Sequence, residues 1–338
     1  MIQVGILGAG RIGQVHMRGI VSGVPNARIR ALADPNLSEP AEQLAKSFGI
    51  PHIGRDYHAV LDDPEIDAVL VCSSTDMHVK LSVEAINAGK HVFCEKPIDH
   101  ELSRISEVEA ALKAGRKGLK YQVGFNRRFD HNFRALKKAV DDGKVGDVQF
   151  VRVSSRDPEP PHAGYVETSG GLFLDMMIHD LDMIRFLSGA EVEEVYALGA
   201  VLIDPAIGAA GDVDTATVSA RMSNGALALI DNSRKAVYGY DQRAEVFGSK
   251  GSVQNGNDLP STMVLSTVDG VTAEKPLWFF LQRYIASYSA EVRSFIDCIE
   301  QDAEPEVGIV DGRMTIRIAL ACKKSLAEHR PVRIDEIV

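Results

Sequence analysis

The fold of the N-terminal part is decided by one stretch, Ile2-Gln-Val-Gly-Ile-Leu-Gly8-Ala9-Gly10-Arg11-Ile12-Gly13. An apolar run ends in a loop of pattern G-x-G-x-x-G, and a helical pattern begins at Arg11. In this strand–loop–helix context the glycines permit a tight turn, close approach of a pyrophosphate and packing of the helix on the strand. We therefore predict a dinucleotide-binding Rossmann fold, with phosphate contacts at the helix N-terminus. The residues expected to make them are Gly8, Gly10, Arg11, Ile12 and Gly13.

A carboxylate follows the second apolar strand. Residues 28–33 form that strand, and Asp34 lies about 20 residues beyond Gly13, where such a residue accepts a hydrogen bond from the adenosine ribose. A carboxylate there would repel a 2′-phosphate, and Pro35 and Asn36 offer no arginine to bind one. NAD is therefore the predicted cofactor, although Arg11 in the loop leaves NADP open.

Strand and helix patterns alternate through residues 1–123, which we predict to be one domain. Further apolar strands are expected at 67–72 and 90–93, with a helix from Asp76, as its N-cap, to Ala88 between them. Continuous apolar strands joined by helices predict a doubly wound parallel sheet covered on both faces. Because ligands bind at the carboxyl ends of such strands, further cofactor contacts are expected from Ser73, Ser74, Thr75, His78, Glu95 and Lys96.

The remaining residues, 124–338, are predicted to form a second α/β domain. Strand patterns follow one another with few helices between them, which predicts an open, mainly antiparallel sheet. These strands are expected at 145–156, 191–203, 212–223, 225–234, 241–247 and 262–268. Helices are expected at 131–142, from the Gly170-Gly171 pair to about residue 187, at 280–300 and at 312–328.

Composition excludes several classes of partner. The 338 residues include 37 Lys and Arg against 47 Asp and Glu, a net charge of −10, and contain no long basic run. Such a chain is a poor ligand for nucleic acid or anionic lipid. Apolar runs are too short for a membrane span, and no basic leader precedes the first strand, so a cytoplasmic protein is expected. The cysteines form no Cys-x-x-Cys pair, which favours reduced thiols and no metal site.

Two motifs carry chemistry. Lys96, in Cys94-Glu95-Lys96-Pro97 at the end of the fourth apolar strand, is expected to face the cofactor and to hold an alcohol oxygen. Asp175, His179 and Asp182 would share one face of an apolar helix, where a buried Asp–His pair is costly without a partner or a role. Histidine titrates near neutrality, which suggests a general base at His179 oriented by Asp175. The alternatives are a surface ion pair at Lys96 and a structural pair at His179; a zinc site lacks a third ligand.

Other polar residues are candidates for binding a ring that bears many hydroxyls. Arg156 and Asp157 end the long strand, and Arg127 lies at the junction of the two predicted domains. A guanidinium donates hydrogen bonds and a carboxylate accepts them, as such a ring requires. Tyr238 and Tyr288 are further candidates. For each of these, a surface ion pair, a tie between the domains or simple packing is the alternative.

In this order, the motifs resemble those of the Gfo/Idh/MocA oxidoreductase family over essentially the whole chain. The resemblance rests on the Gly8–Gly13 loop, Glu95-Lys96-Pro97, Asn126-Arg-Arg-Phe-Asp130 and Asp175-Met-Met-Ile-His179-Asp180. It implies an N-terminal Rossmann domain and a C-terminal α/β domain for substrate binding and oligomerisation, with an open, mainly antiparallel sheet. It also implies subunits that pack through these sheets, often as homotetramers.

Within the family, Ser155-Arg-Asp-Pro158, Gly170-Gly-Leu-Phe-Leu-Asp175 and Phe280-Leu-Gln-Arg-Tyr284 resemble the patterns of inositol dehydrogenases. This implies oxidation of a cyclic polyol, above all myo-inositol to 2-keto-myo-inositol (scyllo-inosose), with NAD and with Lys96, Asp175 and His179 as the catalytic set. Some relatives have asparagine in place of Asp157, which leaves open the ring hydroxyl bound there. A dehydrogenase of another cyclitol or an aldose, such as scyllo-inositol, and a non-catalytic dinucleotide sensor both stay open.

Overall fold

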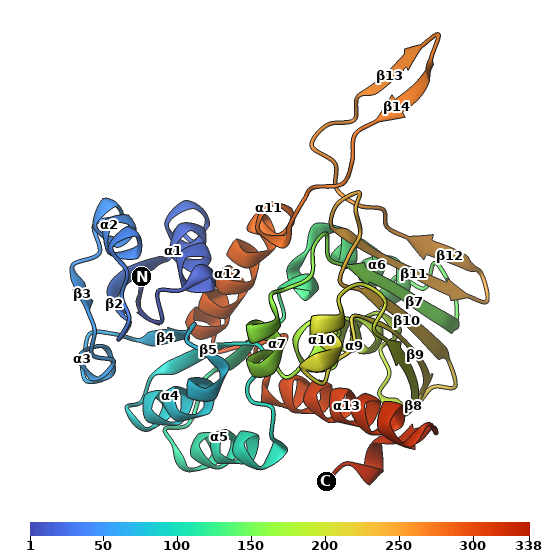
Figure 1. Cartoon of the computed structure of the whole chain (residues 1–338). Helices are drawn as coiled ribbons and strands as arrows, with labels where there is room; N and C mark the ends of the chain where they lie inside the picture. Colours follow the sequence, from blue (N-terminus) through green and yellow to red (C-terminus); the bar gives the residue numbers. More distant parts are fainter. The chain divides into compact units, whose positions relative to one another are not determined.

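The computed structural model describes residues 1–338, apart from the side chain of Ala163. The chain forms two compact units, each with a large sheet of its own (Figure 1). Unit 1 consists of Met1–Phe129 and Ile285–Ile316, and unit 2 of Asp130–Tyr284 and Arg317–Val338. The domain boundary expected between residues 123 and 124 stays a prediction.

Unit 1 is built on a parallel sheet whose six described strands have the order β3-β2-β1-β4-β5-β6. Side chains of adjacent residues in the central strands, such as Val69 and Leu70 of β4, are both fully buried. Both faces of the sheet are therefore covered, as continuous apolar strands require. This confirms the predicted Rossmann sheet. The strands are β1 Ile2–Leu7, β2 Ala27–Ala33, β3 His52–Gly54, β4 Ala68–Val71, β5 His91–Glu95 and β6 Tyr121–Gly124.

The helices of unit 1 connect these strands and add a segment from late in the chain. They are α1 Arg11–Gly23, α2 Glu39–Ser47, α3 His58–Leu61, α4 Thr75–Asn87, α5 Leu102–Ala114, the 3-10 turn η1 Asn126–Phe129, α12 Ile285–Gln301 and the first part of α13 Ile309–Glu328. Helix α12 packs against α1 and η1. The prediction of Asp76 as N-cap of α4 is wrong, because Ser74 precedes the first helical residue. Asp76 lies in the first turn, where its charge still meets the positive end of the helix.

Unit 2 contains a sheet whose seven described strands have the order β12-β11-β7-β10-β9-β8-β15. Strands β7 and β10 are parallel, and the other neighbouring pairs are antiparallel, which confirms the predicted mainly antiparallel sheet. The strands are β7 Val148–Arg156, β8 Val192–Ala200, β9 Thr215–Met222, β10 Leu227–Ser233, β11 Asp241–Gly248, β12 Gly251–Gln254 and β15 Val332–Arg333. The helices are α6 His131–Asp141, α7 Ala163–Ser169, α8 Leu172–Asp175, α9 Ile178–Ser188, α10 Pro205–Ala209, α11 Phe280–Arg283, the rest of α13 and the 3-10 turn η2 Ile334–Glu336.

One face of the unit 2 sheet is covered and the other is open. Helices α9 and α6 pack against β7 and β11, and burial alternates along β9 and β10 with the period of two that a half-covered sheet requires. On the open face, large apolar side chains remain exposed. These are Tyr196, Leu198, Leu227 and Phe247.

Two features interrupt the predicted patterns. The helix expected at 280–300 is split at Tyr284 into α11 and α12, which belong to different units. A hairpin of β13 Val264–Thr267 and β14 Gly270–Ala273 projects from the sheet of its own unit (Figure 1). Its turn includes Val268, whose side chain is fully exposed.

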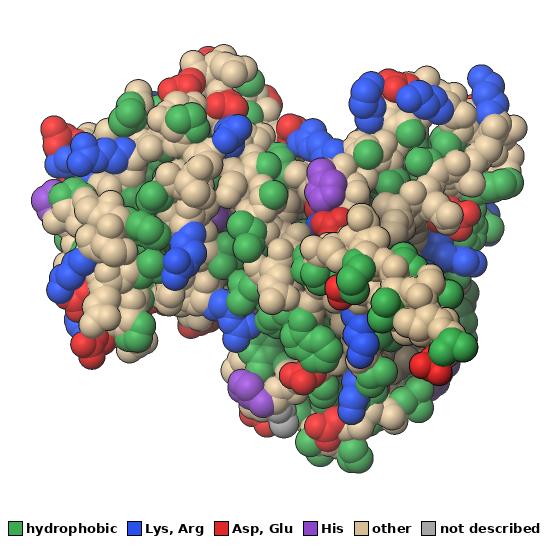
Figure 2. Space-filling view, turned by 90° about the horizontal axis from the view of Figure 1, so that it is seen from above, with side chains coloured by type: hydrophobic (Ala, Val, Ile, Leu, Met, Phe, Trp, Pro, Cys, Tyr) green, Lys and Arg blue, Asp and Glu red, His purple; other side chains and the backbone are tan. Residues whose placement is uncertain are grey.

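The surface carries charges of both signs. On the face drawn in Figure 2, acidic and basic side chains are interspersed, in keeping with the mixed composition of the chain. Among the described residues, no helix has the length and apolar character needed to cross a membrane.

Candidate functional site

The glycine loop forms a cradle that side chains would fill. Gly8 has φ +109°, and a Cβ on it would lie 2.5 Å from the carbonyl oxygen of Cys72. A Cβ on Gly13 would collide with the carbonyl oxygen of Gly8, whereas one on Gly10, the N-cap of α1, would meet nothing within 4 Å. The loop is thus closed against the sheet and open toward the helix N-terminus. This arrangement fits a dinucleotide pyrophosphate.

Asp34, directly after β2, is tied to this loop. Its Oδ2 accepts a hydrogen bond from the Ala9 N–H at 2.6 Å, and its Oδ1 accepts one from the Asn36 N–H at 2.7 Å. Each carboxylate oxygen retains a second lone pair with which to accept a ribose hydroxyl. Tyr57 lies nearby: burial, followed by the charges of Asp34 and Asp76, raises the pKa of its phenol to about 12. Tyr57 is therefore a neutral donor near this carboxylate, and the sequence patterns did not indicate it.

His78 links the loops that follow β4 and β5. It is almost fully buried, its Nδ1 lies 2.7 Å from the Pro97 carbonyl oxygen, and its Nε2 lies 3.1 Å from that of Ser73. Burial lowers the pKa of His78, but Cys94 and these two carbonyl groups outweigh it and raise the pKa to about 9. A protonated ring can donate to both carbonyls. The structure thus places this predicted cofactor contact under the two loops, while Ser73, Ser74 and Thr75 are half-buried or exposed at the start of α4.

Lys96 follows β5 at the carboxyl edge of the parallel sheet, the edge that also carries the glycine loop and Asp34. Its side chain is half-buried, and its peptide bond to Pro97 is cis. The preceding Glu95 is buried, with Oε1 2.6 Å from Nε2 of His16. Parallel topology therefore brings the predicted ammonium and the cofactor cradle to one edge of unit 1.

The helix that carries Asp175 and His179 is not the single run that we predicted. Helix α8 ends at Asp175 and α9 begins at Ile178, and between them the Met177 N–H donates to the Leu172 carbonyl at 2.8 Å. This i→i−5 bond widens the turn, so the regular spacing behind the predicted shared face does not hold. Such widened turns are frequent at functional sites.

Asp175 is held from two sides by residues of unit 2. Tyr165 donates a hydrogen bond to its Oδ1 at 2.9 Å, and Nη1 of Arg234 lies 3.4 Å from its Oδ2. The Arg234 side chain is almost fully buried and also lies 3.9 Å from Asp212, which accepts the Leu172 N–H. We did not predict Arg234 from the sequence, although it continues the alternation of buried residues along β10.

Arg156 and Tyr238 lie together in unit 2. Arg156 donates to Asp231 Oδ1 through Nε at 2.9 Å and Nη2 at 2.6 Å, and through Nη1 to the Tyr238 hydroxyl at 3.2 Å. Tyr238 in turn donates to Asp241 at 2.6 Å.

This group and α9 lie on opposite faces of the unit 2 sheet. Side-chain parity puts Arg156 and Asp231 on the open face, whereas Asn232 faces α9 and donates to Asp180 at 2.8 Å. Asp157, just beyond β7, has backbone bonds to Ser233 and Ala236. The structure therefore does not bring Arg156 to the face on which His179 lies.

Arg127 and Tyr288, the other predicted substrate ligands, are buried in unit 1. The Tyr288 ring meets His16 edge-on, with ring centroids 5.8 Å apart. Arg128, next to Arg127, donates to Asp311 at 2.9 Å.

Comparison with known proteins decides the family. Residues 2–125 match the model of the oxidoreductase family with an NAD-binding Rossmann fold, and residues 133–254 match the GFO/IDH/MocA C-terminal domain. The chain belongs to the GFO/IDH/MocA oxidoreductase family. This confirms the resemblance seen in the sequence.

Several similar members of the GFO/IDH/MocA family are inositol dehydrogenases. The chain is 44% identical to the myo-inositol 2-dehydrogenase of Thermotoga maritima over 100% of both chains. It is 46% identical to the inositol 2-dehydrogenase of Rhizobium meliloti over 98% of this chain and 99% of that one. The crystal structure of the Lactobacillus casei scyllo-inositol dehydrogenase with bound NAD(H) and scyllo-inositol superimposes with a TM-score of 0.91, at 29% identity and 99% coverage of both chains. The protein is thus an NAD-binding oxidoreductase closely related to myo-inositol 2-dehydrogenases.

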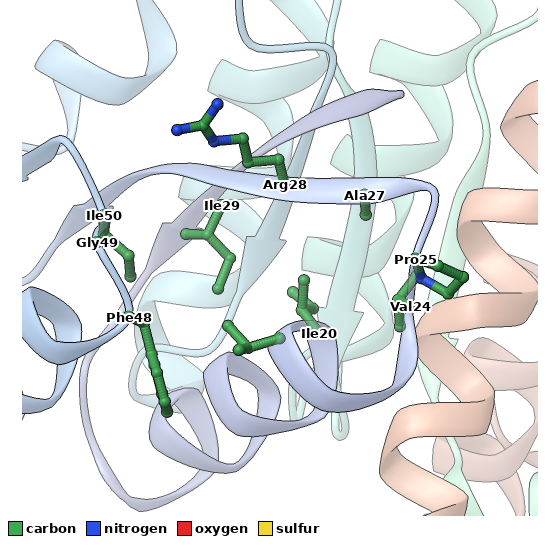
Figure 3. A pocket seen from close by; sticks show the side chains of 10 residues that line it. Ile20, Val24, Pro25, Ala27, Arg28, Ile29, Phe48, Gly49 and Ile50 are labelled. Carbon is green, nitrogen blue, oxygen red and sulfur yellow. The ribbon is translucent and has the colours of Figure 1, made fainter.

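A hollow of about 250 Å³ in this GFO/IDH/MocA oxidoreductase is lined by none of the predicted site residues (Figure 3). It sits at the amino end of β2, the opposite end of the strand from Asp34. Apolar side chains line it, and Arg28 turns away from them (Figure 3). Cofactors bind at the carboxyl ends of parallel strands, so this hollow is not the cofactor site. Its lining is Ile20, Val21, Val24, Pro25, Ala27, Arg28, Ile29, Phe48, Gly49 and Ile50.

Proposed function

We propose that this oxidoreductase oxidises myo-inositol to 2-keto-myo-inositol (scyllo-inosose) with NAD as acceptor. The observation that carries the proposal is full-length similarity, at 44% identity, to a myo-inositol 2-dehydrogenase. Lys96, Asp175 and His179 are all present in the chain. Because a fold alone does not determine a substrate, this assignment requires an activity test.

When bound, NAD supplies the nicotinamide ring that accepts the hydride. In the proposed reaction, His179 acts as general base and takes the proton of the substrate hydroxyl. Lys96 donates a hydrogen bond to the same oxygen and stabilises its developing negative charge. Asp175, held by Tyr165 and Arg234, favours the imidazolium form of His179. A positioned base of this kind contributes about 10²–10⁴-fold to the rate.

Most of the remaining predicted ligands keep the same roles in the proposal. The glycine loop and Asp34 hold the cofactor, with further contacts from Ser73, Ser74, Thr75, His78, Glu95 and Lys96. Arg127, Asp157 and Tyr288 are proposed to bind the polyol, and the open sheet face is the proposed contact between subunits of a homotetramer. Arg156 and Tyr238, the other predicted polyol ligands, bond to Asp231 and Asp241 on that open face, so we propose a structural role for them.

The test is NADH formation by the purified protein with myo-inositol, scyllo-inositol and a set of aldoses, each with NAD and with NADP. We expect the highest kcat/KM for myo-inositol with NAD. Lys96→Ala and His179→Ala should each lower kcat by about 10²–10⁴-fold while NAD still binds. Lys80→Ala, which removes an exposed lysine of α4, is the matched control. Wild-type turnover in either active-site variant would disprove the assigned roles.

A second cyclitol is the specific alternative. The similarity to the Lactobacillus casei enzyme that was crystallised with scyllo-inositol favours scyllo-inositol over an aldose as that alternative. A higher kcat/KM for scyllo-inositol would select it. Tight NAD binding without NADH formation from any polyol would instead favour a dinucleotide sensor.

A further inference from the structure

Three titratable side chains are buried together in unit 1, next to the turn that carries Lys96. His16 comes from α1, Glu95 from the end of β5 and Glu291 from α12. Each offers an atom that lies within 4.8 Å of the others. His16 and Glu291 are 0% exposed and Glu95 is 6% exposed. The proposed reaction uses Glu95 at most as a cofactor contact and does not use the other two.

Glu291 and His16 have buried polar atoms without a hydrogen-bond partner among the described residues. His16 Nε2 lies 2.6 Å from Glu95 Oε1, whereas both carboxyl oxygens of Glu291 lack a hydrogen-bond partner among the described residues. Nδ1 of His16 also lacks one, and the ring is flanked edge-on by Phe93 and Tyr288. A neutral imidazole that donates from Nε2 leaves only a lone pair at Nδ1, whereas an imidazolium would leave an N–H without an acceptor.

An ionised Glu291 would be costly in these surroundings. Two buried carboxylates would then share one neutral imidazole, without the paired cation that buried charges require. Burial, followed by the charge of Glu95, raises the pKa of Glu291 well above its ordinary range. A neutral carboxylic acid at position 291 avoids the burial of a second unpaired charge and the repulsion between the two carboxylates.

The elements packed around α12 bring few other charges to this carboxyl group. Helix α1 contributes His16 and β5 contributes Glu95. The turn η1 contributes the buried Arg127, and Arg128, which is directed to the Glu306 carbonyl and Asp311. From β6, Gln122 donates to the main-chain carbonyl of Glu291 rather than to its side chain. Burial, followed by the charge of Glu95, raises the pKa of the Cys72 thiol well above its ordinary range, so this thiol stays neutral.

We propose that His16, Glu95 and Glu291 form a positioning cluster for the turn that carries Lys96, in which Glu291 is a neutral carboxylic acid and Glu95 keeps the negative charge. His16 fixes the Glu95 carboxylate, and Glu95 is joined to Lys96 by a peptide bond. Gly124 makes room for this carboxylate, because a Cβ there would lie 3.1 Å from Glu95 Cδ.

The protonation of Glu291 is tested without reference to catalysis. Difference infrared spectra at pH 7 between the wild type and Glu291→Gln should contain the C=O stretch of a carboxylic acid. Glu107→Gln, which removes an exposed carboxylate of α5, should leave that band unchanged. Absence of the band from the wild type would overturn the proposal. So would about one equivalent of a divalent metal in the purified wild type that is lost in Glu291→Gln, because a cation would keep Glu291 ionised.

Stability against pH gives a second test that is independent of activity. The folded protein binds a proton at Glu291 more tightly than the unfolded chain, in which the pKa is about 4.3. The free energy of unfolding of the wild type therefore falls as the pH rises above that value, and a glutamine removes this loss. The difference in Tm between Glu291→Gln and the wild type should grow from about pH 5 to pH 8. A constant difference would contradict the proposal, and Glu291→Met, also uncharged, serves if the glutamine variant does not fold.

The positioning role rests on the proposed function and is tested by kinetics. Glu95→Gln should lower kcat roughly 10- to 100-fold through misplacement of Lys96, whereas loss of the proposed cofactor contact of Glu95 would instead raise KM for NAD. Glu291→Gln, which replaces a neutral acid by a neutral amide, should keep kcat within about threefold of the wild type. An equal loss of kcat in both variants would overturn the proposal, whereas a wild type without polyol activity would disprove only the proposed function.

Discussion

Asp175 in unit 2 and Glu95 in unit 1 are both carboxylates beside a residue that we propose to contact substrate, but different partners hold them. Asp175 and the nearby Asp212 share the buried guanidinium of Arg234. Glu95 and Glu291 have only the imidazole of His16 between them. The comparison teaches that one chain compensates its half-buried and buried acids in two ways, by a permanent cation in unit 2 and by a bound proton in unit 1.

The cation of unit 2 gives the largest expected effect. Arg234→Met should destabilise the protein by about 3 kcal/mol, because it removes the buried guanidinium and leaves the half-buried carboxylates of Asp175 and Asp212 without a countercharge. Urea unfolding at pH 7 measures the loss, and Arg234→Lys should recover part of it. If Arg234→Met regained full stability at pH 5, protons would serve in unit 2 as they do in unit 1, and the comparison would fail.

His78 provides a cation inside unit 1 and so sharpens the contrast. Its pKa is raised to about 9 in the folded protein, above the value of about 6.5 in the unfolded chain. Its contribution to stability is complete below about pH 6.5 and is lost as the pH rises through about 9. His78→Gln should therefore cost up to about 3 kcal/mol at pH 6 and much less at pH 9.5. Thermal unfolding at both pH values checks this, and an equal cost at both would argue against a charged ring.

Asp34 is a third case, a carboxylate held by main-chain amides. Asp34→Ser should reduce the preference for NAD over NADP by about 10- to 100-fold, since it removes the acceptor for the ribose hydroxyl and the repulsion of a 2′-phosphate. The ratio of kcat/KM values for the two cofactors measures the change. An unaltered ratio would remove Asp34 from the cofactor site.

The smallest effect is expected on the open face of unit 2. Arg156 pairs with Asp231, and both side chains are about one-third exposed, so Arg156→Met should cost less than about 1 kcal/mol. Comparison with Arg234→Met tests whether burial determines how much an ion pair contributes to the free energy of unfolding. The KM for myo-inositol of the same variant tests the predicted substrate contact, which an unchanged KM would contradict.

Much of the fold could be predicted because its signals are local. The glycine loop after a continuous apolar strand specifies the Rossmann sheet, and strands that follow one another without helices specify the antiparallel one. The break between Asp175 and Ile178 could not be predicted, because an i→i−5 bond leaves the apolar pattern of 172–187 unchanged. The split at Tyr284 could not be predicted either, because the helical pattern expected at 280–300 continues across it.

Arg234 and Glu291 occupy inward-facing positions in the sequence pattern, but this pattern can be interpreted only once the fold is known. Arg234 has the same parity as the buried Ala228 and Ile230 of β10, and Glu291 lies in the apolar stripe of α12 with Tyr288 and Phe295. A charged residue in such a position indicates a buried partner. The identity of that partner depends on contacts between distant segments, which no local pattern contains.

The hydrogen bond from the Ala9 amide to Asp34 has a practical consequence for biocatalysis. On the proposed role of Asp34, a variant that accepts NADP would lack this carboxylate, and its removal also frees an amide within the glycine loop. Replacement of the acid by a small residue, with the three glycines untouched, is therefore the economical starting point for such a redesign.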